Sequence, residues 1–137
     1  MNWLIVISFL FYSLNVTGFR IKKFVFVTSC LKDEPVDLVF WVPYCAFVIT
    51  FIFAPHIGQW LLLGAFLFFH LVCFFSTYRY WVKPDEKKIA SYNQYFSHTH
   101  HIVKPRSNVL IPDTFHICIF SMFFVNLVAI VIYIIFG

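Results

Sequence analysis

The chain has 137 residues, of which 61% are apolar and only 12% charged. Soluble domains carry about 25% charged residues, and a soluble domain of this size could not bury so much apolar surface. The composition therefore predicts one membrane domain covering residues 1–137, with the lipid bilayer as its surroundings. The net charge of +4 does not indicate a nucleic-acid partner, because the basic residues flank apolar segments, where they set orientation and meet anionic headgroups.

Four apolar segments have about the length of a membrane-spanning helix, which needs roughly 20 apolar residues. We expect spans at residues 3–19, 36–54, 57–80 and 114–136. The second and third segments are joined by residues 55–59, whose Pro and Gly suit a tight turn. The predicted fold is an all-α integral membrane protein with four transmembrane helices in a four-helix bundle.

The basic residues predict the orientation of these spans. All ten Lys and Arg lie in or beside two predicted loops, residues 20–35 and 81–113. They are Arg20, Lys22, Lys23, Lys32, Arg79, Lys83, Lys87, Lys88, Lys104 and Arg106. Because basic loops stay in the cytoplasm, both loops are expected inside and both chain ends outside. Three spans would place one basic loop on the wrong face.

The first apolar segment has a second interpretation as a cleaved signal peptide. Its length suits that interpretation, but residues 16–18 make a poor cleavage site and no Lys or Arg precedes the segment. Cleavage would also leave the first basic loop outside. We therefore favour a retained first span.

The second loop contains a possible short helix. Two acidic residues follow Pro84, as at a helix start, and Ile89, Tyr92 and Phe96 repeat at helical spacing. An amphipathic helix lying on the inner leaflet and a solvated loop explain this pattern equally well, and the sequence leaves both open.

Three histidines in the same loop, His98, His100 and His101, are the candidate metal ligands. Neutral imidazoles can bind zinc, copper or iron, and the cluster resembles the cytosol-facing His clusters of membrane desaturases and hydroxylases over these few residues. Such enzymes use several His boxes, whereas the chain has three further His, and Asp113 lies twelve residues beyond His101. We favour a polar loop over a metal site.

Two polar residues, His70 and Asn126, are expected inside the membrane. An ionisable group at that depth suggests function, so His70 could bind haem, relay a proton or contact a partner helix. The favoured alternative is a hydrogen bond across the bundle to Ser121 or Asn126. A haem held by His70 and His116 is disfavoured, because the two differ in depth by about 10 Å at 1.5 Å per residue.

The remaining residues offer little chemistry. All six acids lie in loops or at span ends, so no embedded carboxylate supports proton-coupled transport, and Asp37 and Asp113 are expected to cap helices. The acids are Asp33, Glu34, Asp37, Asp85, Glu86 and Asp113. The four cysteines form no CxxC pair and are expected to be free, buried thiols. No nucleophile or nucleotide-binding motif is present, and we expect no cofactor.

The sequence thus favours a small non-catalytic polytopic membrane protein that binds another membrane protein, as an accessory subunit or an immunity-type protein. The alternative is a membrane metal-dependent or redox enzyme of lipid metabolism that uses His98, His100 and His101. A small transporter is a third, weaker possibility. A bacterial inner membrane is the simplest location, since no transit peptide is present, and an organelle inner membrane remains open.

Overall fold

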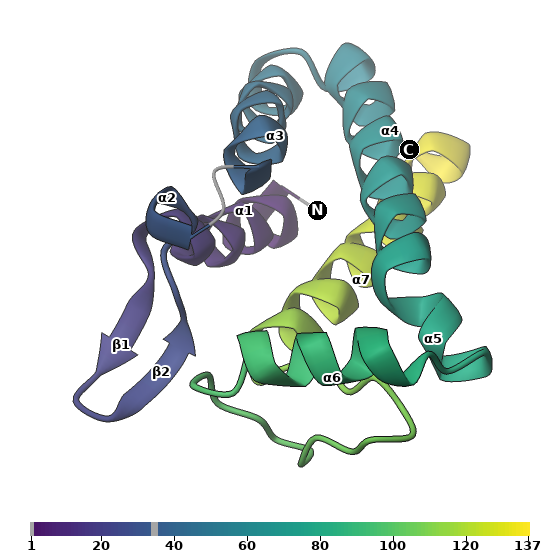
Figure 1. The fold of residues 1–137 in the computed structure, drawn as a ribbon. Helices are drawn as coiled ribbons and strands as arrows, with labels where there is room; N and C mark the ends of the chain where they lie inside the picture. The colour runs from purple at the N-terminus through teal and green to yellow at the C-terminus, as the bar shows by residue number, and fades with distance from the viewer. Residues whose placement is uncertain (1, 34–35) are drawn as a thin grey trace.

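The structure is a computed structural model that describes residues 2–33 and 36–137. Residues 34–35, at the end of the first predicted loop, lie outside the described residues. The prediction that Glu34 lies in this loop therefore concerns a residue that the structure does not describe. The fold is mostly helical, with four long helices in the four predicted apolar segments (Figure 1). These are α1 (Asn2–Thr17), α3 (Val36–Phe53), α4 (Pro55–Cys73) and α7 (Thr114–Phe136).

The third apolar segment forms one continuous rod, Pro55–Val82, of 28 residues. In it α4 passes into a π turn, η1 (Phe74–Tyr78), and then into α5 (Arg79–Val82). Pro55 begins the rod at a position where its missing N–H is not needed. Within the described residues, this rod and the 23-residue α7 are the two helices long and apolar enough to cross a membrane, whereas α1 and α3 are apolar but shorter.

A small β-hairpin in the first basic loop was not predicted, so the chain is not purely α-helical. Strands β1 (Phe19–Ile21) and β2 (Phe24–Val27) pair antiparallel, and Lys22 in their turn has a left-handed φ of 53°. The alternating Phe and Val of β2 suit a pleated, half-buried strand. Val27 is buried in the main core, and the short helix α2 (Cys30–Asp33) follows it.

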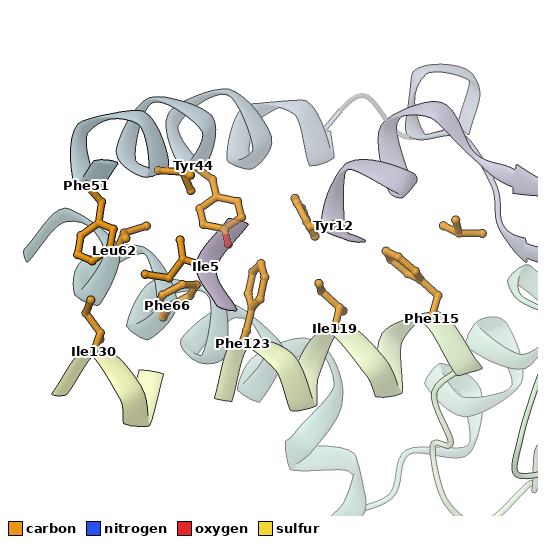
Figure 2. Packing of buried hydrophobic residues seen from close by; sticks show 12 residues of the cluster. Ile5, Tyr12, Tyr44, Phe51, Leu62, Phe66, Phe115, Ile119, Phe123 and Ile130 are labelled. Atoms are coloured by element: carbon orange, nitrogen blue, oxygen red, sulfur yellow. The ribbon is translucent and has the colours of Figure 1, made fainter. Parts of the chain in front are cut away.

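The main contacts between the long helices are in the pairs α1–α3, α3–α4, α4–α7 and α1–α7. Their shared core is rich in aromatic rings (Figure 2). Phe123 of α7 is fully buried at its centre, with ring centroids 4.5 to 5.5 Å from those of Tyr12, Tyr44, Phe66 and Phe69. One α7 residue therefore contacts all three other long helices.

Of the two interpretations of the second loop, a short helix and a solvated loop, the structure shows the helix. Helix α6 (Glu86–Tyr95) begins after Asp85, whose carboxylate accepts a hydrogen bond of 3.1 Å from the Lys88 backbone N–H. Ile89 is fully buried and packs with Tyr80 and Leu110. As a result α6 lies across the ends of α5 and α7 (Figure 1).

Candidate functional site

An apolar groove of about 660 Å³ lies between α3 and α4. Its α3 wall contains Val39, Phe40, Pro43 and Phe47, and its α4 wall contains Trp60, Leu61, Phe68 and Val72. Asp37 lies at one end, in the first turn of α3, and Trp60 lies toward the opposite end, near the α3–α4 turn. The groove thus runs along most of the helix pair and has one carboxylate.

Two glycines of α4 explain why the groove exists. A Cβ at Gly58 would lie 2.2 Å from the Phe51 Cα, so this glycine allows α3 and α4 to touch near their turn. A Cβ at Gly64 would meet nothing within 4 Å. Gly64 and the buried Ala65 both line the groove, and the space beside Gly64 is open.

Asp37 connects this groove with a smaller polar hollow. Its carboxylate accepts a hydrogen bond of 2.6 Å from the Asn15 side chain of α1. It lies one residue inside α3, so the expectation that it caps the helix is corrected to a contact with α1. The same carboxylate lines a hollow of about 120 Å³ together with Cys30, Asp113 and His116.

Asp113 caps α7, as expected, and its carboxylate also binds the second loop through a hydrogen bond from Thr99. It is 1% exposed, and it accepts hydrogen bonds from the His116 N–H (3.0 Å), the His116 Nδ1 (2.6 Å) and the Thr99 hydroxyl (2.8 Å). Burial alone would raise the pKa of Asp113, but the hydrogen bonds and charge of His116, with the bond from Thr99, outweigh it and lower the pKa. Asp113 is therefore a carboxylate at neutral pH.

Cys30 lines the same hollow as the Asp113–His116 pair. A carboxylate and an imidazole are two of the three members of a catalytic triad, so Cys30 is the candidate for the third. However, burial and the nearby Asp37 charge raise the pKa of Cys30, whereas a nucleophilic cysteine needs a lowered one. We interpret the pair as a structural fastening.

The three histidines of the predicted metal site point to separate partners. His100 Nδ1 lies 2.7 Å from the Thr114 hydroxyl, His101 Nδ1 lies 2.9 Å from the Thr99 carbonyl oxygen, and His98 is exposed. In the part of the chain that the structure describes, no three His, Cys, Asp or Glu side chains are placed to hold a metal ion. The geometry gives the metal hypothesis no support.

Among the described hydrogen bonds, none joins His70 to Ser121 or Asn126 of α7. Its Nδ1 lies 3.1 Å from the Tyr78 hydroxyl, on the same rod, while the Ser121 hydroxyl donates to the carbonyl of Ile117. The expected partners Ser121 and Asn126 are therefore wrong. His70 contacts α7 through its ring, whose centroid is 6.1 Å from that of Phe124.

Asn126 is a buried polar residue of α7 that joins two helices. It is 1% exposed, and its Nδ2 donates to the Ser8 hydroxyl of α1 and to the Met122 carbonyl. Sequence reasoning missed Ser8, and it missed the contact between Asn15 and Asp37. Ser8, Tyr12 and Asn15 recur at helical spacing, which was the available signal for a polar stripe on the packed face of α1.

Comparison with known proteins gives no match: no protein-family model, curated protein or solved structure resembles this chain closely enough to be matched. The class that the fold defines is a mostly helical protein with two helices able to span a membrane. Its function is therefore argued from the groove and the surface residues.

Proposed function

We propose that the chain is a small non-catalytic membrane protein that acts by binding a transmembrane helix of another membrane protein. The observation that carries this proposal is the α3–α4 groove, which is open, apolar and bounded at one end by Asp37. The protein would serve as an accessory subunit or an immunity-type protein of its partner.

Four membrane crossings are part of this proposal. The rod and α7 exceed the roughly 30 Å hydrocarbon thickness, and the 18-residue α3 lies within the usual 17–25 residues for a span. The 16-residue α1 is about 24 Å long, a mismatch that local thinning of the bilayer accommodates. Both basic loops then lie inside and both ends outside, in a four-helix bundle of a bacterial inner membrane or an organelle inner membrane.

The groove suits a helix better than a lipid chain for two reasons. Gly64, a small residue beside open space in the groove, allows another helix backbone to approach closely. In the proposed orientation Asp37 lies at the inner end of the groove, where transmembrane helices carry Lys or Arg. A basic residue of the partner can therefore pair with Asp37, whereas an acyl chain has no charge to offer.

A photocrosslinking experiment tests this proposal. A Val39→Cys variant, at an exposed position on the α3 wall of the groove, is labelled with a photoactivatable reagent in membranes, and the adducts are separated by mass. We expect one defined protein adduct. A label that attaches only to lipid would contradict helix binding in the groove.

A second variant tests whether the space itself is needed. Gly64→Leu adds a side chain in the groove, where its Cβ meets no described atom within 4 Å, and Val128→Leu enlarges the side chain at an exposed position of α7, outside the groove. In mild detergent, we expect the partner identified by crosslinking to co-purify with Val128→Leu at wild-type yield and not to co-purify with Gly64→Leu. Retention by Gly64→Leu would contradict the proposal.

A further inference from the structure

Two hollows open at the inner end of the rod, and Arg79 borders both. One, of about 640 Å³, extends toward Lys83 and Lys87 and includes the acidic Asp85 and Glu86. The other, of about 530 Å³, lies between the rod and α6, which extends sideways from the end of α5 (Figure 1). The chemistry of the second hollow differs from that of the first.

The second hollow is lined by groups that bind phosphate. Arg79 and Lys88 contribute cations, and Ser76 and Ser91 contribute hydroxyls. None of the described residues that line it is acidic. Guanidinium, ammonium and hydroxyl groups are the usual protein partners of phosphate oxygens.

Arg79 is held in place at the edge of this hollow. Its Nη2 donates a hydrogen bond of 2.7 Å to the Tyr80 hydroxyl, and its Cζ lies 4.8 Å from the centroid of the Tyr80 ring. Tyr80 itself is buried with Ile89 and Leu110. The guanidinium has five N–H donors, so this anchoring leaves donors for a ligand.

The cations near this hollow have no acidic partner in the part of the chain that the structure describes. Among the described residues, the one ion pair joins His116 and Asp113, so no Lys or Arg is neutralised by a carboxylate. The Asp85 carboxylate accepts the Lys88 backbone N–H instead. An external anion would therefore relieve the repulsion between Arg79 and Lys88.

The π turn above Arg79 supplies an apolar surface for the rest of the ligand. Turns of this kind occur frequently at functional sites, and η1 ends directly before Arg79. Phe75 of this turn lines the hollow and is 56% exposed. A ligand with a phosphate at Arg79 can thus lay a hydrocarbon chain against Phe75, which favours a lipid over free phosphate.

We infer that the hollow between the rod and α6 binds a phosphate-bearing anionic lipid, with its phosphate on Arg79 and Lys88 and an acyl chain along Phe75. This inference rests on the membrane embedding proposed above and does not depend on a partner helix in the α3–α4 groove. Basic pockets at the inner membrane surface are known to bind anionic headgroups.

Lipid binding to the purified protein in a non-ionic detergent tests the inference. Native mass spectrometry compares phosphatidic acid, diacylglycerol with the same chains, and inorganic phosphate as a competitor. We expect phosphatidic acid to bind by far the tightest. Equal binding of diacylglycerol would overturn phosphate recognition, and displacement of the lipid by an equal concentration of inorganic phosphate would assign the site to free phosphate.

Matched charge variants locate the site. The pair Arg79→Gln with Lys88→Gln should weaken phosphatidic acid binding about 25-fold, since each cation near a membrane surface contributes about fivefold. The control pair Lys22→Gln with Lys23→Gln removes the same charge from the β-hairpin turn and should leave binding unchanged. Equal losses in the two pairs would overturn a discrete site.

Lys88→Gln alone guards against a folding defect. No described hydrogen bond uses the Lys88 side chain, so this variant should keep the fold and still lose about fivefold in affinity. Wild-type affinity in a folded Lys88→Gln protein would contradict the inference. A chain that stays in solution without detergent would instead contradict the membrane embedding itself.

Discussion

The Asn126 side chain of α7 donates a hydrogen bond to the Ser8 hydroxyl of α1, across 118 positions of sequence. Both residues are buried in the centre of the helix assembly, at 1% and 0% exposure. The Ser8 hydroxyl in turn donates to the Leu4 carbonyl of its own helix. The first and last helices are thus joined by one buried polar contact.

Replacing Asn126 should loosen this contact. Asn126→Ala is expected to lower the free energy of unfolding by about 0.6–1.7 kcal/mol, the range for hydrogen bonds between membrane helices. Unfolding by SDS titration of the detergent-solubilised protein measures the change. Ser121→Ala is the control, because the Ser121 hydroxyl bonds its own helix and is exposed. Equal stability of the two variants would contradict the structural role of Asn126.

Alanine substitutions at the two glycines of α4 should act in opposite directions. Gly58→Ala forces a Cβ against the Phe51 backbone and should cost about 1–3 kcal/mol, as overpacking does. Gly64→Ala enters open space and should stabilise the helix by about 0.5–1 kcal/mol. The same SDS titration measures both. A destabilised Gly64→Ala protein would mean that the groove is filled by the chain itself.

The pH dependence of stability should depend on Asp113. Its pKa in the folded protein is lowered below the usual value of an aspartate, about 3.9. Its contribution to stability is therefore complete above about pH 4 and is lost as the pH falls through the lower, folded pKa. Thermal unfolding of the wild type from about pH 5 downward should show this loss.

An Asp113→Asn variant should be less stable at pH 5 and lose less stability below about pH 4. Asp37, Cys30 and His116 line the small hollow beside the Asp113 carboxylate, and burial together with the Asp113 charge raises the pKa of Tyr92 of α6. His116→Gln is measured in the same way, so that the contribution of the His116 imidazole can be distinguished from that of Asp113. An acid loss of wild-type size in Asp113→Asn would assign the effect to another carboxylate.

The N-cap of α6 can be tested without touching the membrane helices. Asp85→Ala removes the acceptor for the Lys88 N–H and should destabilise α6 by about 0.5–2 kcal/mol. Hydrogen exchange in residues 86–95 should become faster. Asp85→Ser keeps a capping oxygen and should protect these amides nearly as well as the wild type. Identical exchange in all three proteins would show that tertiary contacts alone hold α6.

The long helices could be predicted because long apolar segments have few other structures available, and α6 has a readable start at Asp85. The contacts between helices could not be predicted, since they depend on how each helix is rotated against its neighbours. Thus Tyr78, not Ser121, is the partner of His70. The groove could not be predicted for the same reason. Gly58 contacts the Phe51 backbone and Gly64 borders open space because of the position of α3, which the sequence does not specify.

The hairpin in the first basic loop was hidden by its shortness and charge. The basic residues Arg20, Lys22 and Lys23 were used to predict membrane orientation. Their charge does not indicate the backbone conformation of the loop. The strand signal was limited to Phe24–Val27. Its stability depends on Val27 reaching the helix core, a contact that local sequence does not specify.

Membrane topology is the most direct test of the account. A reporter enzyme that is active only outside the cytoplasm is fused after Gly137 or after Lys88, and its activity is compared at equal protein levels. We expect activity from the Gly137 fusion and none from the Lys88 fusion. Silence at Gly137 with activity at Lys88 would contradict four crossings and an inner position for both basic loops.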